Sequence, residues 1–151
     1  MKHFFFYSSL TFLFCFSNTN CSSQQISKAN KEVLVAEVNE LFGKNNKWDF
    51  ERMKVDINGS LKYIMCLSPE CNPYASWDFF IKNILPMKVG KFEEYTTIDF
   101  VCKDSADCIV PTGYEKGGRY EPKKVFQFFI KDKKIGKEIV DKLNKLQEME
   151  Y

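Results

Sequence analysis

An uncharged apolar run at the N-terminus decides how much of this chain can take part in a fold. The run covers 13 residues, from Phe4 to Phe16; it follows Met1-Lys2-His3 and gives way to polar residues over 17–25. A basic start, a short apolar stretch and a small polar exit are typical of a secretory signal. A membrane-spanning helix needs about 20 apolar residues, more than this run contains. We therefore predict that residues 1–21 are an export signal outside the fold.

The position of the cleavage site leaves two alternatives for Cys21. Cleavage before Ser22 would discard Cys21 and release a secreted protein. The segment also resembles a bacterial lipoprotein signal, in which the apolar run ends at a lipid-bearing cysteine that a polar tether follows, here residues 22–25. That resemblance implies a membrane anchor on Cys21, although Asn20 stands where the family usually has Gly, Ala or Ser. Both alternatives predict export, either as a secreted protein or as a lipid-anchored protein of the cell envelope.

Removal of the signal also removes the only histidine, His3. A mature chain without histidine lacks the base of Ser-His-Asp and Cys-His nucleophiles and the commonest metal ligand. We therefore predict no catalytic residue, cofactor or metal site, and a small module that binds rather than catalyses. Two alternatives stay open: a carboxylate-based extracytoplasmic hydrolase, with Asp99 beside Glu93 or Glu94 as a candidate acid pair, and a secreted inhibitor or toxin-like factor.

The charge distribution restricts the class of partner. The chain has 22 Lys and Arg residues against 20 Asp and Glu residues, and loss of residues 1–20 would leave 21 against 20. The charges are interspersed, whereas nucleic-acid binding relies on clustered cations that neutralise phosphates. We expect an unknown protein or surface polymer as the partner, no nucleic acid, and membrane contact only through a lipid on Cys21.

Four cysteines in the mature chain predict two disulfides. Cys66, Cys71, Cys102 and Cys108 form an even set in an exported domain, which favours structural disulfides. The spacing favours the local pairs Cys66–Cys71 and Cys102–Cys108, because residues 102–108 are typical of a hairpin loop whose flanking positions lie within disulfide reach. Redox and zinc patterns are absent, since neither bracket is a C-x-x-C motif.

Apolar periodicity predicts an N-terminal helix and a first hairpin. Residues 27–42 carry apolar side chains at helical spacing before Gly43, a helix stop, so residues 22–47 are expected to be tether plus helix. Two strands, 48–57 and 60–66, flank Asn58-Gly59. A three-residue loop over 57–59, with Gly59 left-handed, would pair Val55 with Leu61 and Met53 with Tyr63 and gather the apolar side chains on one face.

The rest of the chain predicts further strands and a closing helix. Residues 74–89 fit a helix or a strand equally well; 95–102 and 125–131 read as strands, and 108–110 would pair back on 95–102. Residues 133–149 form an amphipathic helix capped by Asp132. We therefore predict an α+β domain in which an antiparallel sheet of about five strands and the C-terminal helix (48–151) pack with the N-terminal helix.

The C-terminal half resembles a group of small uncharacterised bacterial lipoproteins. The likeness rests on a strand that ends in a cysteine (98–102), a second cysteine followed by Ile (108–109), an aromatic strand (126–129) and a closing helix (139–146). Some of these proteins have a pleckstrin-homology-like shape, a bent antiparallel sheet closed by a C-terminal helix. The resemblance implies that shape for this chain and supplies no functional residues.

The loop over residues 112–122 is the most site-like segment of the sequence. It combines glycines with Tyr114, Lys116, Arg119 and Tyr120 between two predicted strands. Loops on a rigid sheet often carry binding residues, and Tyr with Arg makes good contact surface. We expect ligand contacts from these four side chains; a solvated connection without a binding role is the alternative.

Overall fold

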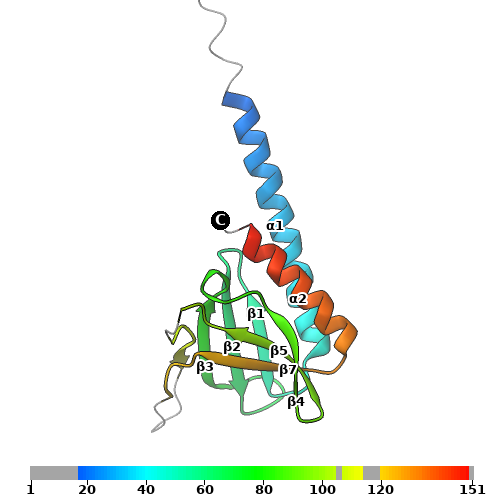
Figure 1. Ribbon diagram of the computed structural model, residues 1–151, viewed down its shortest axis with the longest axis vertical. Coiled ribbons are helices and arrows are strands. Elements are labelled where there is room, and N and C mark those ends of the chain that lie inside the picture. Colours follow the sequence, from blue (N-terminus) through cyan, green and yellow to red (C-terminus); the bar gives the residue numbers. More distant parts are fainter. Residues whose placement is uncertain (1–16, 105–106, 114–119, 150–151) are drawn as a thin grey trace, which may run out of the picture. The chain divides into compact units, whose positions relative to one another are not determined.

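A computed structural model describes residues 17–104, 107–113 and 120–149 of the chain (Figure 1). It divides into two compact units, Met1–Asn30 and Lys31–Tyr151. The described part of the first unit is helical, and the second unit holds the sheets and the C-terminal helix. None of the described helices is long and apolar enough to cross a membrane.

Helix α1 extends over Ser17–Asn45 and is longer than the predicted helix at both ends. Residues 22–25, predicted to be a tether, lie within it, because no Gly or Pro interrupts the sequence before Gly43. Gly43 does not end the helix either, since the polypeptide keeps its helical conformation to Asn45. Within the second unit, α1 buries Leu34, Val38 and Phe42.

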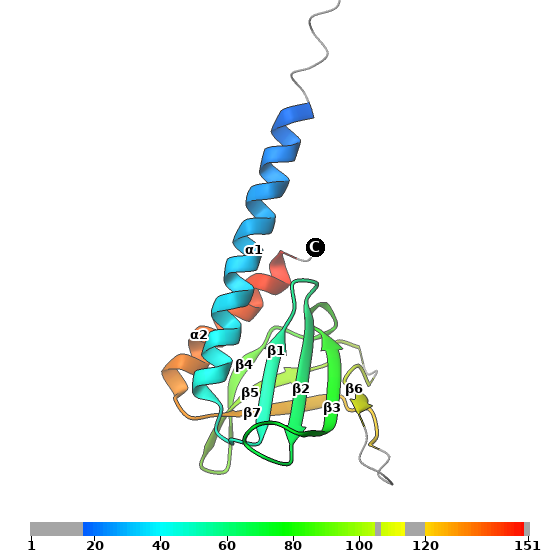
Figure 2. The same ribbon diagram turned by 180° about the vertical axis from the view of Figure 1, so that it is seen from behind.

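Within the described residues, seven strands form two antiparallel sheets instead of one sheet of about five. The strands are β1 (Glu51–Val55), β2 (Ser60–Cys66), β3 (Pro73–Phe80), β4 (Lys88–Phe92), β5 (Tyr95–Val101), β6 (Val110–Gly113) and β7 (Val125–Ile130). The four-stranded sheet has the order β1-β2-β3-β6, and the three-stranded sheet has the order β4-β5-β7. The two sheets face each other with crossing strands, as the opposite views of Figures 1 and 2 show. The α+β class is confirmed.

The first hairpin has the predicted register. Val55 pairs with Leu61 and Met53 with Tyr63. Gly59 has a φ of 76°, a left-handed conformation that favours glycine. Met53, Val55, Leu61 and Tyr63 are buried on one face as predicted.

The ambiguous segment 74–89 contains a strand, β3, followed by the short 3-10 helix η1 (Ile81–Asn83). Trp77 and Phe79 of β3 lie opposite Tyr63 and Leu61 of β2, so period-two burial favours the strand. The predicted return of residues 108–110 onto the strand before Cys102 is wrong, because β6 pairs with β3 of the other sheet. Strand β5 pairs with β4 and β7 instead.

Aromatic rings fill the space between the two sheets. Tyr63 of the four-stranded sheet lies 4.5 Å from Phe126 of the three-stranded sheet, measured between ring centroids. Phe79 and Phe100 make a second such contact at 5.3 Å. Phe128 is fully buried and meets Phe42 of α1 edge to face at 5.4 Å. The core thus joins both sheets and the C-terminal end of α1.

Helix α2 (Lys133–Glu148) closes the domain as predicted. The Asp132 side chain caps its first turn by accepting hydrogen bonds from the backbone N–H groups of Lys134 and Ile135. Ile139 and Leu143 are fully buried. The helix approaches the three-stranded sheet closely at Gly136, where a Cβ atom would overlap Ile130.

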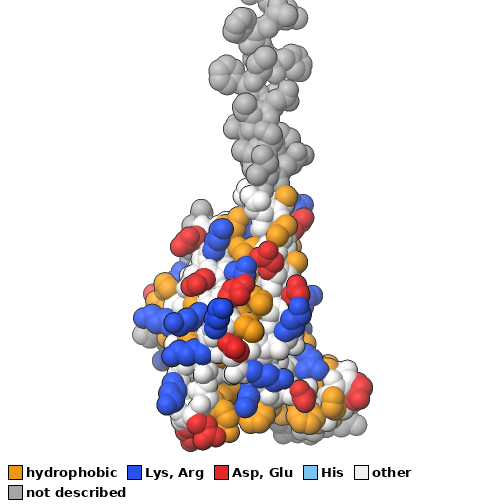
Figure 3. Space-filling view, turned by 90° about the vertical axis from the view of Figure 1, so that its right-hand side faces the viewer, with side chains coloured by type: hydrophobic (Ala, Val, Ile, Leu, Met, Phe, Trp, Pro, Cys, Tyr) orange, Lys and Arg blue, Asp and Glu red, His pale blue; other side chains and the backbone are white. Residues whose placement is uncertain are grey.

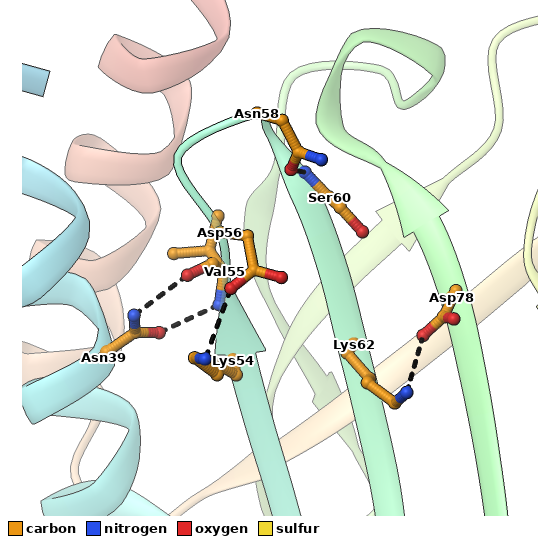
Figure 4. A network of polar contacts seen from close by, with 8 residues as sticks. All are labelled: Asn39, Lys54, Val55, Asp56, Asn58, Ser60, Lys62 and Asp78. Atoms are coloured by element: carbon orange, nitrogen blue, oxygen red, sulfur yellow. Dashed lines mark hydrogen bonds and ion pairs between the residues drawn. The ribbon is translucent and has the colours of Figure 1, made fainter. Parts of the chain in front are cut away.

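Side-chain amides attach both helices to backbone N–H and C=O groups that are not hydrogen-bonded to a neighbouring strand. Each of three asparagines bonds to the N–H and the C=O of a single residue, as a neighbouring strand would. The pairs, with their two distances, are Asn39 with Val55 (2.8 and 2.9 Å, Figure 4), Asn45 with Asp132 (2.9 and 3.3 Å) and Asn144 with Met87 (2.8 and 3.1 Å). The amide of Gln147 donates to the carbonyls of Ile81 and Ile84, both at 2.6 Å.

Both predicted disulfides are present. The Cα atoms of Cys66 and Cys71 lie 4.7 Å apart, and those of Cys102 and Cys108 lie 5.8 Å apart. The first closes the turn between β2 and β3, and the second closes the connection from the three-stranded to the four-stranded sheet. Disulfides of this kind are compatible with an exported protein.

Candidate functional site

The segment after α1 runs beside β7 and places Trp48 at the edge of the three-stranded sheet. Asn46 forms an antiparallel bridge with Ile130. The N–H of Lys47 donates to the carbonyl of Phe129 at 3.2 Å, and Lys131 donates to the carbonyl of Asn45 at 3.0 Å. These bonds attach the polypeptide to β7 and fix the point at which Trp48 emerges.

Four aromatic side chains form a connected row on the outer side of this sheet, which we call the aromatic face: Trp48, Phe92, Tyr95 and Phe129. The ring centroids lie 5.8 Å apart for Trp48 and Tyr95, 5.9 Å for Tyr95 and Phe129, and 6.1 Å for Phe129 and Phe92. Trp48 is 40% exposed and Phe92 is 47% exposed. The sheet therefore presents a continuous apolar surface to solvent.

The row lies outside because of the pleat of the strands. Ile98 and Phe100 of β5 point into the core, so Tyr95, Thr97 and Asp99 point away from it. Phe129 is the cross-strand partner of Thr97, and Thr97 is nevertheless fully buried. Aromatic rings that shield a small polar neighbour explain how an outward-facing threonine loses contact with water.

The ring planes of the aromatic face are inclined to one another. The angle is 59° between Trp48 and Tyr95, 84° between Tyr95 and Phe129, and 87° between Phe92 and Phe129. Such edge-to-face contacts hold each ring in place.

Polar groups give the aromatic face a defined charge pattern. The Lys47 ammonium lies 5.8 Å from the Trp48 ring centroid and 5.4 Å from that of Tyr95, within the range of cation–π attraction. A hydrogen bond to Glu94 raises the pKa of Tyr95. Beside the rings, Oδ1 of Asp99 accepts hydrogen bonds from the Thr97 hydroxyl at 2.7 Å and the Gln127 amide at 3.0 Å.

The wider surface carries mixed charge. On the side of the molecule drawn in Figure 3, Lys and Arg side chains lie among Asp and Glu side chains, and hydrophobic side chains gather at the lower edge. Two more apolar side chains are exposed, Phe50 at 50% and Leu67 at 57%. Neither sign of charge dominates this side of the molecule.

Of the four loop residues predicted to bind a ligand, Tyr114, Lys116 and Arg119 lie outside the described residues. Tyr120 is half-buried, and its ring centroid lies 5.1 Å from that of Trp77. Trp77 belongs to the core, with the Lys123 ammonium 5.1 Å from its ring centroid. The described contacts of Tyr120 are therefore packing contacts that fix the end of the loop.

A shallow hollow of about 470 Å³ adjoins this loop. Asp107, Tyr120, Glu121 and Pro122 line it. Both carboxylates are solvent-exposed, whereas the acid pairs of hydrolases lie in desolvated clefts. Asp99, predicted to pair with Glu93 or Glu94, accepts hydrogen bonds from Thr97 and Gln127 instead. Among the described residues, no group of three or more His, Cys, Asp and Glu side chains gathers as metal ligands would.

The inner side of the four-stranded sheet carries one desolvated acid, Glu51. Burial raises its pKa above the ordinary value of 4.5, and a hydrogen bond from Tyr63 opposes that rise. Its Oε2 atom is buried and has no hydrogen-bond partner among the described residues. Burial, followed by the hydrogen bond with Glu51, also raises the pKa of Tyr63. The ionised carboxylate therefore destabilises the folded state.

Replacement of Glu51 by glutamine is expected to raise the free energy of unfolding at pH 7 by about 1 kcal/mol, because an uncharged amide avoids the desolvation of a carboxylate. The pKa of Glu51 is higher in the folded chain than in the unfolded chain. The wild type is therefore destabilised by ionised Glu51 at pH values above the folded pKa. This destabilisation disappears as the pH falls below the unfolded pKa. Urea unfolding at pH 7 and at about pH 4 measures the difference. A gain that is equal at both pH values would contradict this explanation.

The residues of the aromatic face come from four separate places in the chain, at positions 48, 92, 95 and 129. The sequence gives each of them an ordinary packing role, and only the pairing of β4, β5 and β7 assembles them. Cys21 lies within α1. No family model and no curated protein matches this chain.

Proposed function

We propose that this protein is an exported binding module that recognises a partner protein through the aromatic face. The observation that carries the proposal is the connected row of four rings, partly exposed, on a hydrogen-bonded sheet. Large aromatic side chains with few rotatable bonds lose little entropy on binding and dominate the energy of many protein interfaces. Export rests on the N-terminal sequence and is compatible with the two disulfides.

The aromatic face has the composition of an interface centre. Trp48 and Tyr95 belong to the residue types most enriched at binding hot spots, and Lys47 and Asp99 add one charge of each sign beside them. The bonds from Lys47 and Lys131 to the opposite backbone fix the surface before a partner arrives. A rigid surface limits the entropy lost on association.

The test compares alanine variants of matched exposure. Trp48→Ala combined with Phe92→Ala is expected to weaken partner binding by at least about thirtyfold, since the loss of even one hot-spot residue costs about 2 kcal/mol or more. Phe80→Ala is the control, because Phe80 is 41% exposed and lies on β3 of the other sheet. Tyr120→Ala tests the loop. Affinity is measured against the partner recovered by cross-linking to the wild type, and near-ultraviolet circular dichroism checks each fold.

Two outcomes would contradict the proposal. Undiminished partner binding by the Trp48 and Phe92 double variant would exclude the aromatic face. Loss of binding in the Tyr120 variant alone would move the interface to the loop over 112–122. Loss in the double variant, with binding retained by Phe80→Ala, supports the proposal.

A further inference from the structure

A groove of about 340 Å³ lies between the C-terminal part of α1 and the free edge of β1. Its size is that of a small ligand site, and its accessible lining is mostly apolar. The groove is lined by Asn39, Phe42, Gly43, Asn46, Arg52, Met53, Lys54 and Ile64. All of these residues belong to the second unit, Lys31–Tyr151.

The edge of β1 presents one backbone position to this groove. Strand β1 pairs only with β2, so every second residue turns its N–H and C=O away from the sheet. Val55 does so, because both groups bond to the side-chain amide of Asn39. Met53, two residues earlier, has the same orientation and lines the groove. Its backbone donor and acceptor therefore point into the groove.

Side-chain amides already bond to the backbone of the residues two before and two after Met53. Asn39 bonds to Val55 at 2.8 and 2.9 Å, and the Asn46 amide donates to the carbonyl of Glu51. Figure 4 shows the Asn39 side chain turned toward the strand. A primary side-chain amide holds one N–H and its C=O on the same side, as one residue of an added strand holds its N–H and its C=O. The middle position therefore suits one residue of a peptide backbone that a ligand supplies.

The walls of the groove define the remainder of the ligand. Phe42, Met53 and Ile64 are apolar, and a Cβ atom at Gly43 would meet nothing within 4 Å, so the space beside the helix is open. The charged lining residues, Arg52 and Lys54, are both cations.

The two cations are not equivalent. The Arg52 guanidinium is occupied by the backbone carbonyls of Asp49, Glu51 and Pro69. The Lys54 side chain is 67% exposed, with its ammonium 3.3 Å from Asp56, and can turn toward a ligand. A negatively charged ligand group is therefore expected beside Lys54.

We propose that this groove binds the C-terminus of an apolar peptide. The N–H and C=O of the residue before the last pair with the C=O and N–H of Met53, the terminal side chain packs against Phe42 and Ile64, and the free carboxylate approaches the Lys54 ammonium. This site is separate from the aromatic face and does not depend on it. Recognition of a chain end through an edge backbone position and one cation is a compact form of strand addition.

The experiment uses N-acetylalanylphenylalanine as the probe and the ¹⁵N-labelled chain, with amide shifts followed by NMR. We expect a shift of the Met53 amide and a Kd of about 1 mM. N-acetylalanylphenylalaninamide, which lacks the carboxylate, is expected to bind about tenfold more weakly. Gly43→Leu fills the groove and should abolish the Met53 shift, whereas Lys44→Leu adds the same side chain one position along the helix, outside the lining residues.

Each arm has a result that would overturn the proposal. Unchanged probe affinity in Gly43→Leu would show that the ligand lies elsewhere. Equal affinity of the acid and the amide would remove the terminal carboxylate and so the C-terminal assignment. The absence of any Met53 shift at about 10 mM probe would exclude the site itself. A thermal midpoint in Gly43→Leu that is not lower than in the wild type keeps loss of binding distinct from loss of fold.

Discussion

Replacement of Asn39 by leucine is expected to lower the free energy of unfolding by about 3 kcal/mol, because it leaves the N–H and C=O of buried Val55 without partners. Leucine keeps the branched shape and the number of side-chain heavy atoms, so the main loss is that of the two hydrogen bonds. Urea unfolding measures it as a lower midpoint at an unchanged slope.

The neighbouring residue supplies the control for this substitution. Glu40 follows Asn39 on α1, is exposed and pairs only with Lys44 among the described residues. Glu40→Leu is therefore expected to change stability by less than about 0.5 kcal/mol. If Asn39→Leu proved no more destabilising than Glu40→Leu, the amide would not be holding the helix to the strand.

Replacement of Gly136 by leucine is expected to lower the free energy of unfolding by about 3 kcal/mol, because the new side chain has no room beneath α2. A Cβ atom at this position would overlap Cδ1 of Ile130 and would lie 3.9 Å from Val89. Gly43→Leu is the matched control, since the same change in open space on α1 improves helix propensity by up to about 1 kcal/mol. Thermal unfolding should separate the two variants in opposite directions.

A double-mutant cycle tests the cause of the Gly136 effect. Gly136→Ala introduces only the colliding Cβ, and Ile130→Val removes the Cδ1 atom that it meets. We expect the combined loss of stability to be smaller than the sum of the single losses by about 1 kcal/mol. Strict additivity would mean that the helix, rather than Ile130, moves to admit the alanine.

Local patterns predicted the first hairpin and the last helix because each depends on residues near in sequence. Gly59 fixes the turn, and alternating apolar residues leave one register that buries a single face. The cap at Asp132 and the stripe through Ile139 and Leu143 likewise belong to one continuous segment. Such signals need no knowledge of the rest of the fold.

The division into two sheets could not be predicted in the same way. Strand β4 is short, carries lysines at 88 and 91, and shows no clear apolar alternation, as is common for edge strands. The Cys102–Cys108 loop has hairpin spacing, yet the polypeptide leaves one sheet there and joins the other. The disulfide could be predicted because its two cysteines are close in sequence. The pairing of the strands on either side of it could not, because it depends on the distant strands β3 and β7.

The two candidate sites also depend on distant residues. The aromatic face needs Trp48, Phe92 and Phe129 brought together by three strands, and the groove needs α1 placed beside β1. A loop rich in Tyr, Arg and Gly is conspicuous in the sequence, but its described member Tyr120 packs on Trp77. An unusual loop composition can be seen in the sequence, whereas residues that meet only in the folded chain cannot. The two candidate sites are of the second kind.

The short pairing of residues 45–47 with β7 has a consequence for the dynamics of the domain. Hydrogen bonds run in both directions between these segments, through Lys47 to Phe129 and through Lys131 to Asn45, and the Asn45 side chain extends them to Asp132. The end of one helix, the last strand and the start of the other helix thus share one set of bonds. None of the three can open without releasing the others, so their amide protons should exchange with solvent as a single cooperative unit.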